Sequence, residues 1–175
     1  HSFSLSPVSC LSIFVSYFFW CRYWKDLNRL NEDKVIHLWF KAALVFSLVS
    51  SICAFGLTYM MSNKIVHQNW YLASIYFFLH FQYNGWFFFA GMGLLVAKLE
   101  NLNPVIKNLK FPFFLFCLAC VPAYFLSALW LPIPRIIYWF IVAAVISQLT
   151  GWVLVIKIFI SNKILNQFTL TALME

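Results

Sequence analysis

The sequence is poor in charged residues, and acidic residues are the rarest of them. Only 10% of its 175 residues are charged, with five acidic and twelve basic side chains, whereas an average soluble domain has about 25%. Hydrophobic residues make up 63% of the chain and fall in long runs. Since the stretches between these runs are all short, an ordinary soluble domain is excluded, and the pattern indicates an integral membrane protein.

The sequence also lacks the motifs on which soluble enzymes build their sites. It has no P-loop, no dinucleotide-binding glycine fingerprint, no H-E-x-x-H and no G-x-S-x-G. Cys117 and Cys120 form a single C-x-x-C without an accompanying histidine, which is too few ligands for a zinc site. Whether the protein is an enzyme is therefore left open by the sequence.

The apolar runs predict the fold. We expect membrane-spanning helices over 8–24, 38–61, 70–97, 111–131 and 136–160, because roughly 20 apolar residues cross the hydrocarbon core of a bilayer. The fold class is then all-α: a polytopic transmembrane helical bundle of about five spanning helices, forming one domain over the whole chain.

The placement of the cationic residues predicts the orientation of these spans. They gather in two connections, with Arg22, Lys25, Arg29 and Lys34 in 22–37 and Lys98, Lys107 and Lys110 in 98–110. By the positive-inside rule both connections are cytoplasmic, so the N-terminus lies outside and the C-terminus inside. The same rule accounts for the net charge of +7. Without a basic helix face, no nucleic-acid partner is expected.

The third apolar run has polar residues at its middle. His80, Gln82, Tyr83 and Asn84 fall within five consecutive positions, and polar groups at membrane depth are rare and face a protein interior or a cavity. At about 100° per helical residue, Tyr76, His80, Tyr83 and Asn84 share one face, and Gln82 lies on the opposite one. The sequence therefore predicts a one-sided polar stripe near mid-membrane.

Two interpretations of His80 stay open at this point. Imidazole is the commonest metal ligand, so His80 is a candidate ligand for a haem iron or copper, with Tyr83 and Asn84 in support. Alternatively, His80 and Asn84 hydrogen-bond a neighbouring helix and serve only to hold the helices together. Ser147 and Gln148 lie near the middle of the last run and are candidates to face His80.

The segment from His80 to Trp86, HFQYNGW, resembles the H-x-[NQ]-x-x-G-W element of bacterial membrane proteins related to haem-copper oxidase (cytochrome c oxidase) subunit I. The resemblance covers most of the chain and implies an uncharacterised polytopic family of the bacterial inner membrane. Related members carry a histidine where this chain has Phe78. Only His80 is carried over as a haem or copper ligand.

The resemblance implies redox, metal-binding or proton-handling chemistry through His80. The alternatives are a transporter or channel segment whose polar stripe lines a substrate path, and a purely structural membrane subunit. The chain starts at His1 and ends without a terminal pattern, so we expect a piece of a longer protein. Its expected partners are the lipid bilayer and the remaining helices of the full-length protein or partner membrane subunits.

Overall fold

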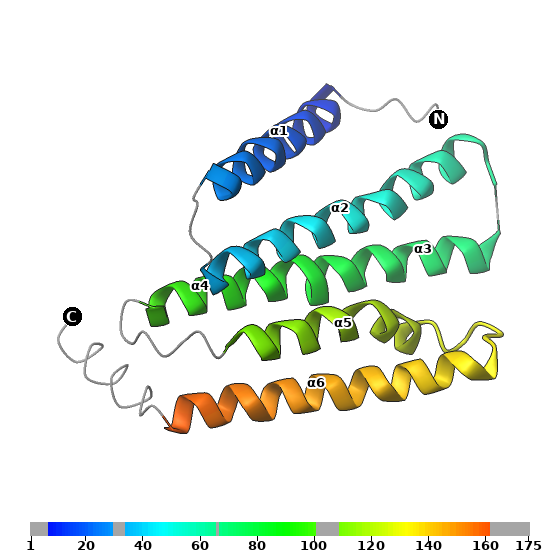
Figure 1. Ribbon diagram of the computed structural model, residues 1–175. Helices are drawn as coiled ribbons and strands as arrows, with labels where there is room; N and C mark the ends of the chain where they lie inside the picture. The colour runs from blue at the N-terminus through cyan, green and yellow to red at the C-terminus, as the bar shows by residue number, and fades with distance from the viewer. Residues whose placement is uncertain (1–6, 30–33, 66, 101–108, 162–175) are drawn as a thin grey trace, which may run out of the picture.

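A computed structural model describes residues 7–29, 34–65, 67–100 and 109–161, and within these residues it contains helices and short turns but no strand (Figure 1). The all-α fold class is confirmed for this part of the chain. In order, the helices are α1 (Pro7–Arg29), α2 (Val35–Ser62), α3 (Gln68–His80), η1 (Phe81–Phe87), α4 (Phe88–Glu100), α5 (Lys110–Ser127) and α6 (Arg135–Ser161).

Three of these helices are long and apolar enough to cross a membrane. They are α2, α5 and α6, and they correspond to the expected runs 38–61, 111–131 and 136–160. Helices α3, η1 and α4 follow one another directly and cover the expected run 70–97. Many large apolar side chains on these helices are exposed, which suits contact with lipid and places the protein in a membrane.

Helix α1 continues beyond the end of its apolar run. The sequence predicts a connection over 22–37, but α1 extends through Arg29 and α2 already begins at Val35. The extra turns bury Leu27, which is 5% exposed. Just before these extra turns, the indole Nε1–H of Trp20 donates to the backbone carbonyl of Leu44 on α2 at 3.0 Å. Packing against α2 therefore extends the helix into the hydrophilic segment.

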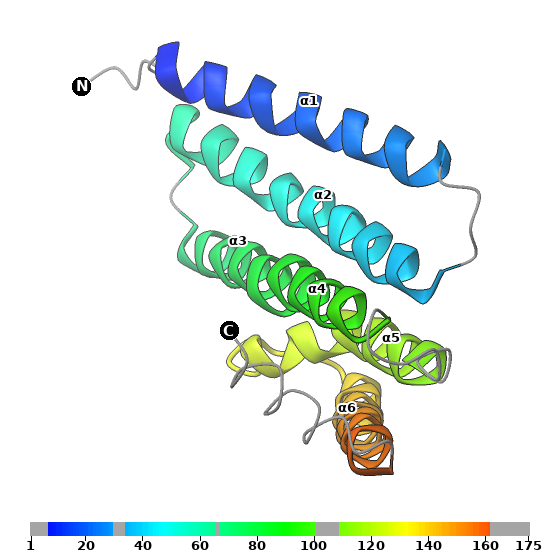
Figure 2. The same cartoon turned by 90° about the vertical axis from the view of Figure 1, so that its left-hand side faces the viewer.

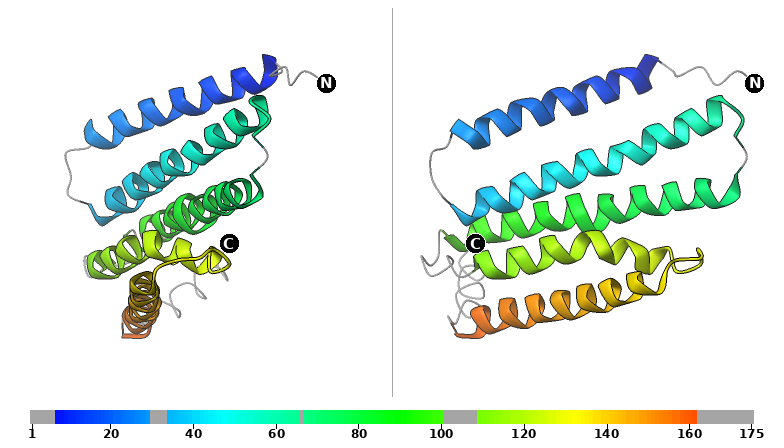
Figure 3. Two further views of the ribbon diagram at one scale, coloured as in Figure 1. Left: turned by 90° about the vertical axis from the view of Figure 1, so that its right-hand side faces the viewer. Right: turned by 45° about the vertical axis from the view of Figure 1, so that its right-hand side comes forward.

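The helices lie side by side in chain order, and each neighbour runs in the opposite direction. Figure 2 shows α1 at one edge, followed by α2, the α3–η1–α4 rod, and then α5 and α6. The further views in Figure 3 show the same order. Helix α1 packs on α2, whereas the α3–η1–α4 rod contacts both α2 and α5. The expected polar segment thus lies in the middle of the arrangement.

An aromatic cluster joins α2, α4 and α5. Trp39 of α2 is completely buried, and its ring centroid lies 5.1 Å from that of Phe113 and 5.5 Å from that of Phe89. Phe88 and Phe116 pack around the same indole. Burying rings of this size dominates core energetics, so the cluster fixes the α3–η1–α4 rod between α2 and α5.

Candidate functional site

The polar segment of the third run forms a π-helix, η1, between two α-helical stretches. Its backbone lies directly on α2, because a Cβ added at Gly85 would stand 2.6 Å from Cβ of Phe46. A π-helix closes i→i+5 hydrogen bonds. It therefore has more residues per turn, and rotates less per residue, than an α-helix. Side-chain directions therefore drift along η1 from those of a regular α-helix.

His80 ends α3 and links the rod to α5. Its ring is buried, with 6% of the residue exposed, and Nε2 lies 2.9 Å from the backbone carbonyl oxygen of Cys120. Its other ring nitrogen, Nδ1, lies 3.3 Å from the side-chain nitrogen of Asn84. The thiol of Cys120 also donates to the backbone carbonyl oxygen of Asn84, with 3.6 Å between sulfur and oxygen.

These two contacts assign the tautomer of His80. A carbonyl oxygen only accepts, so Nε2 carries the proton and donates it to Cys120. An amide nitrogen only donates, so Nδ1 uses its lone pair to accept from Asn84. The imidazole is therefore neutral, and both of its nitrogens are engaged by the protein.

Gln82 points away from His80, toward α2, as the helical spacing predicts. Ser50 of α2 is 2% exposed, and its hydroxyl proton is shared between the carbonyl of Ser47 at 2.7 Å and Oε1 of Gln82 at 3.0 Å. The rod is thus tied to α5 through His80 and to α2 through Gln82. Sequence reasoning missed Ser50, although it lies about as far before the α2–α3 turn as Gln82 lies after it.

The predicted polar stripe does not form one buried face. His80 is buried, but Tyr76 is 41% exposed, Tyr83 is 61% exposed, and Asn84 is also exposed. Only Asn84 reaches the imidazole. Tyr76 in α3 and Tyr83 in η1 are exposed on either side of His80 in the chain, so the two phenols do not share its buried surroundings.

Ser147 and Gln148 were expected to face His80, but the structure does not bring Ser147 to that ring. The hydroxyl of Ser147 instead donates to the backbone carbonyl of Leu115 on α5 at 3.1 Å. Gln148 is half-buried and makes no hydrogen bond within the described residues. The physical reason is that α5 lies between α6 and the buried side of His80, whose own partner is Cys120.

The arrangement around His80 does not fit a haem or copper ion. Both ring nitrogens hold hydrogen bonds, so a metal would have to displace either Cys120 or Asn84. Among the described residues, no three His, Cys, Asp or Glu side chains gather into a group that could hold a metal ion. Metal ligation by His80 therefore stays a prediction that requires a different side-chain arrangement.

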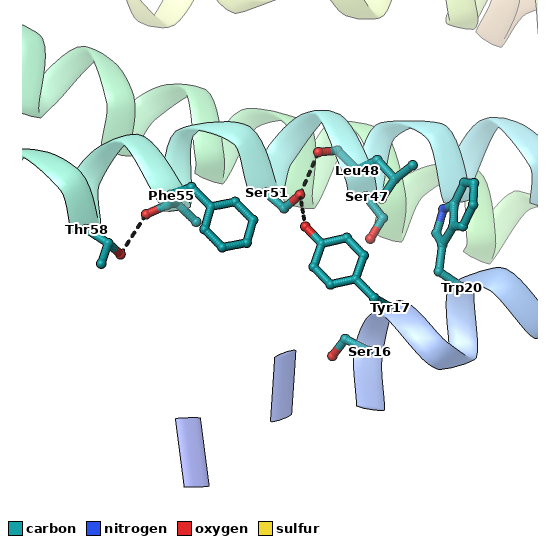
Figure 4. A pocket seen from close by; sticks show the side chains of 9 residues that line it. Ser16, Tyr17, Trp20, Ser47, Leu48, Ser51, Phe55 and Thr58 are labelled. Atoms are coloured by element: carbon teal, nitrogen blue, oxygen red, sulfur yellow. Dashed lines mark hydrogen bonds between the residues drawn. The ribbon is translucent and has the colours of Figure 1, made fainter. Parts of the chain in front are cut away.

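A hollow of about 250 Å³ lies between α1 and α2 (Figure 4). The hydroxyl of Tyr17 donates to Ser51 at 2.9 Å, since the Ser51 proton goes to the carbonyl of Leu48 at 2.7 Å. Thr58 likewise returns its proton to its own helix, at the carbonyl of Ala54. The hydroxyl groups of these side chains are thus already bonded within the protein, and the hollow presents mostly small side chains.

The fold and the polar contacts define a membrane-embedded all-helical protein with hydrogen-bonded ties between neighbouring helices. Comparison of the chain with protein-family models, with curated proteins and with solved structures finds no match. The resemblance to haem-copper oxidase subunit I therefore stays a prediction.

Proposed function

We propose that the chain is a structural membrane subunit whose buried polar side chains hold neighbouring spans in register. The observation that carries the proposal is the double engagement of His80, with Cys120 on one ring nitrogen and Asn84 on the other. A metal ligand needs one ring nitrogen without another partner, whereas here the bond to Cys120 joins the rod to α5 and the bond to Asn84 occupies the remaining nitrogen. Such polar contacts between spans stabilise membrane helix packing.

Further support comes from the tie on the opposite side of the rod. Ser50 and Gln82 join α2 to η1, and Tyr124 of α5 donates its hydroxyl to the Ala73 carbonyl on α3 at 3.1 Å. Polar groups buried between helices are costly when unpaired, so they penalise wrong registers. The rod is thereby fixed along its length by polar contacts on two faces.

We also propose that α1 and the α3–η1–α4 rod cross the bilayer, which gives about five spans in the plasma membrane. Support comes from the cationic residues at one end of the helices in Figure 1, namely Arg29, Lys34, Lys98, Lys110 and Lys157. Only Lys64 and Arg135 lie at the other end of the described chain. By the positive-inside rule the end that is rich in cations is cytoplasmic.

A reporter enzyme fused after Lys64 tests this orientation. We expect the reporter fused after Lys64 to lie outside the cell, because Lys64 follows α2 at the end that is poor in cations. In a matched fusion after Lys98, the reporter should lie in the cytoplasm. A cytoplasmic reporter at Lys64 would overturn the proposed topology.

An absorbance spectrum of the purified full-length protein tests the structural role against the redox role. We expect no Soret band, and identical spectra for the wild type and His80→Ala, because the ring nitrogens of His80 are already bonded. The control is His37→Ala, at a half-buried position of α2. A Soret band that weakens in His80→Ala alone would establish haem ligation in place of the proposed role.

A further inference from the structure

Residues at both ends of η1 pack against a single side chain of α2. The ring centroid of Phe46 lies 5.8 Å from that of Phe81, the first residue of η1, and 5.1 Å from that of Phe89 in α4. Gly85, halfway between them, also lies on Phe46, since an added Cβ would stand 2.6 Å from its Cβ. On a regular α-helix, positions eight residues apart point in directions about 80° apart. The shared contact indicates that the rod does not turn as a regular α-helix here.

The burial pattern of the rod repeats every four residues through this segment. One series of buried positions is Phe81, Gly85, Phe89 and Gly93. One series of exposed positions is Leu79, Tyr83, Phe87 and Gly91. Because an α-helix has about 3.6 residues per turn, four-residue steps drift by about 40° each, or about 120° over three steps. A helix with more residues per turn, such as η1, removes this drift.

The mismatch between the two halves of the rod amounts to one residue. Before the middle of η1, the buried residues are His80 and Phe81. After it, they are Gly85, Phe89, Met92, Gly93, Val96 and Leu99. Placed on a regular α-helix, the mean directions of these two groups differ by about 100°, which is the rotation of a single residue. The rod therefore contains one residue more than a regular α-helix with one buried face would have.

We propose that η1 is a register device: it takes up this extra residue, so that α3 and α4 present one continuous face to α2 and α5. His80 can then bond the Cys120 carbonyl of α5 at 2.9 Å. At the same time Phe89 packs on Trp39 of α2 and Phe113 of α5, at centroid distances of 5.5 and 6.0 Å. The contacts on both sides of η1 thus depend on its wider turns. The proposal deepens the structural role proposed above and rests on it.

Deletion of Tyr83 from the full-length chain tests the device. Tyr83 is 61% exposed within η1, and without it the two groups of buried residues fall on one side of a regular α-helix. We expect η1 to become α-helical and the unfolding equilibrium constant, measured by circular dichroism in mixed micelles, to stay within about fivefold of the wild type. Insertion of one alanine after Tyr83 should raise that constant more than about tenfold, because it adds a second residue in excess.

Deletion of Val142 from α6 is the matched control. Val142 is 49% exposed, and α6 is α-helical from Arg135 to Ser161, so it holds no residue in excess. The deletion should turn Gly151 by about 100° relative to α5, away from Phe116, which stands 3.0 Å from a Cβ added there. We expect the unfolding equilibrium constant to rise more than about tenfold.

The asymmetry between deletion and insertion at Tyr83 is the deciding result. If both changes were tolerated, or if both were damaging, η1 would not be a register device. A Tyr83 deletion that fails to fold would overturn the proposal in the same way. So would a tolerated deletion of Val142, since the tolerance would then not be particular to η1. Failure of the structural role itself would be seen separately, as a Soret band that weakens in His80→Ala.

Discussion

Replacing His80 with alanine should lower the free energy of unfolding by about 1 to 3 kcal/mol, the cost of leaving buried hydrogen-bonding groups unsatisfied. The substitution removes the donor to the Cys120 carbonyl and the acceptor for the Asn84 amide at once. It also empties the space that the ring fills between the rod and α5. Unfolding in mixed micelles, followed by helical circular dichroism, measures the loss.

Two further variants separate a helix tie from a metal ligand. His80→Gln should recover a large part of the stability, because its amide can both donate to Cys120 and accept from Asn84. His37→Ala, at a half-buried position of α2, should stay within about 0.5 kcal/mol of the wild type. If His80→Ala proved as stable as His37→Ala, the tie would contribute nothing and the proposed role would fail.

Replacing Gly85 with alanine should destabilise the protein by about 1 to 3 kcal/mol, the usual cost of overpacking a well-packed core. The added Cβ would stand 2.6 Å from Cβ and 3.0 Å from Cγ of Phe46. Since Cβ of Phe46 is fixed to the α2 backbone, rotation of the ring gives little relief. The helices must separate, and the bond between Ser50 and Gln82 should lengthen with them.

Gly56→Ala is the matched control for this prediction. Gly56 lies in α2, and nothing stands within 4 Å of an added Cβ. Alanine favours helix by up to about 1 kcal/mol over glycine, so this variant should be neutral or slightly more stable. Equal destabilisation by the two substitutions, in the same unfolding assay, would show that the contact with Phe46 is not what Gly85 provides.

The all-helical fold class was predictable because the apolar runs are separated only by short hydrophilic connections. Four of the five expected spans lie almost wholly within described helices, and in the fifth, 111–131, only the last residues pass the end of α5. The register of an antiparallel pair also follows from distance to the turn, which is how Ser50 meets Gln82. The helix ends were less predictable, since burial of Leu27 extends α1 past its apolar run.

The candidate site was predictable only in part. The sequence placed polar side chains near the middle of the third run and separated Gln82 from His80, but α-helical spacing does not anticipate the π-helix η1. The partner of His80 had no signal either, because the acceptor is the backbone carbonyl of Cys120. Every residue has such a group, so only the packing of α5 selects this one.

Nitrogen NMR of the histidine rings, recorded on the full-length protein in bilayers, tests the role of His80 most directly. Loss of one signal in His80→Gln assigns it. We expect a neutral ring with its proton on Nε2 and with Nδ1 as acceptor, the pattern that the Cys120 and Asn84 contacts require. A ring nitrogen bound to a metal, or a proton on Nδ1 with Nε2 free, would contradict it.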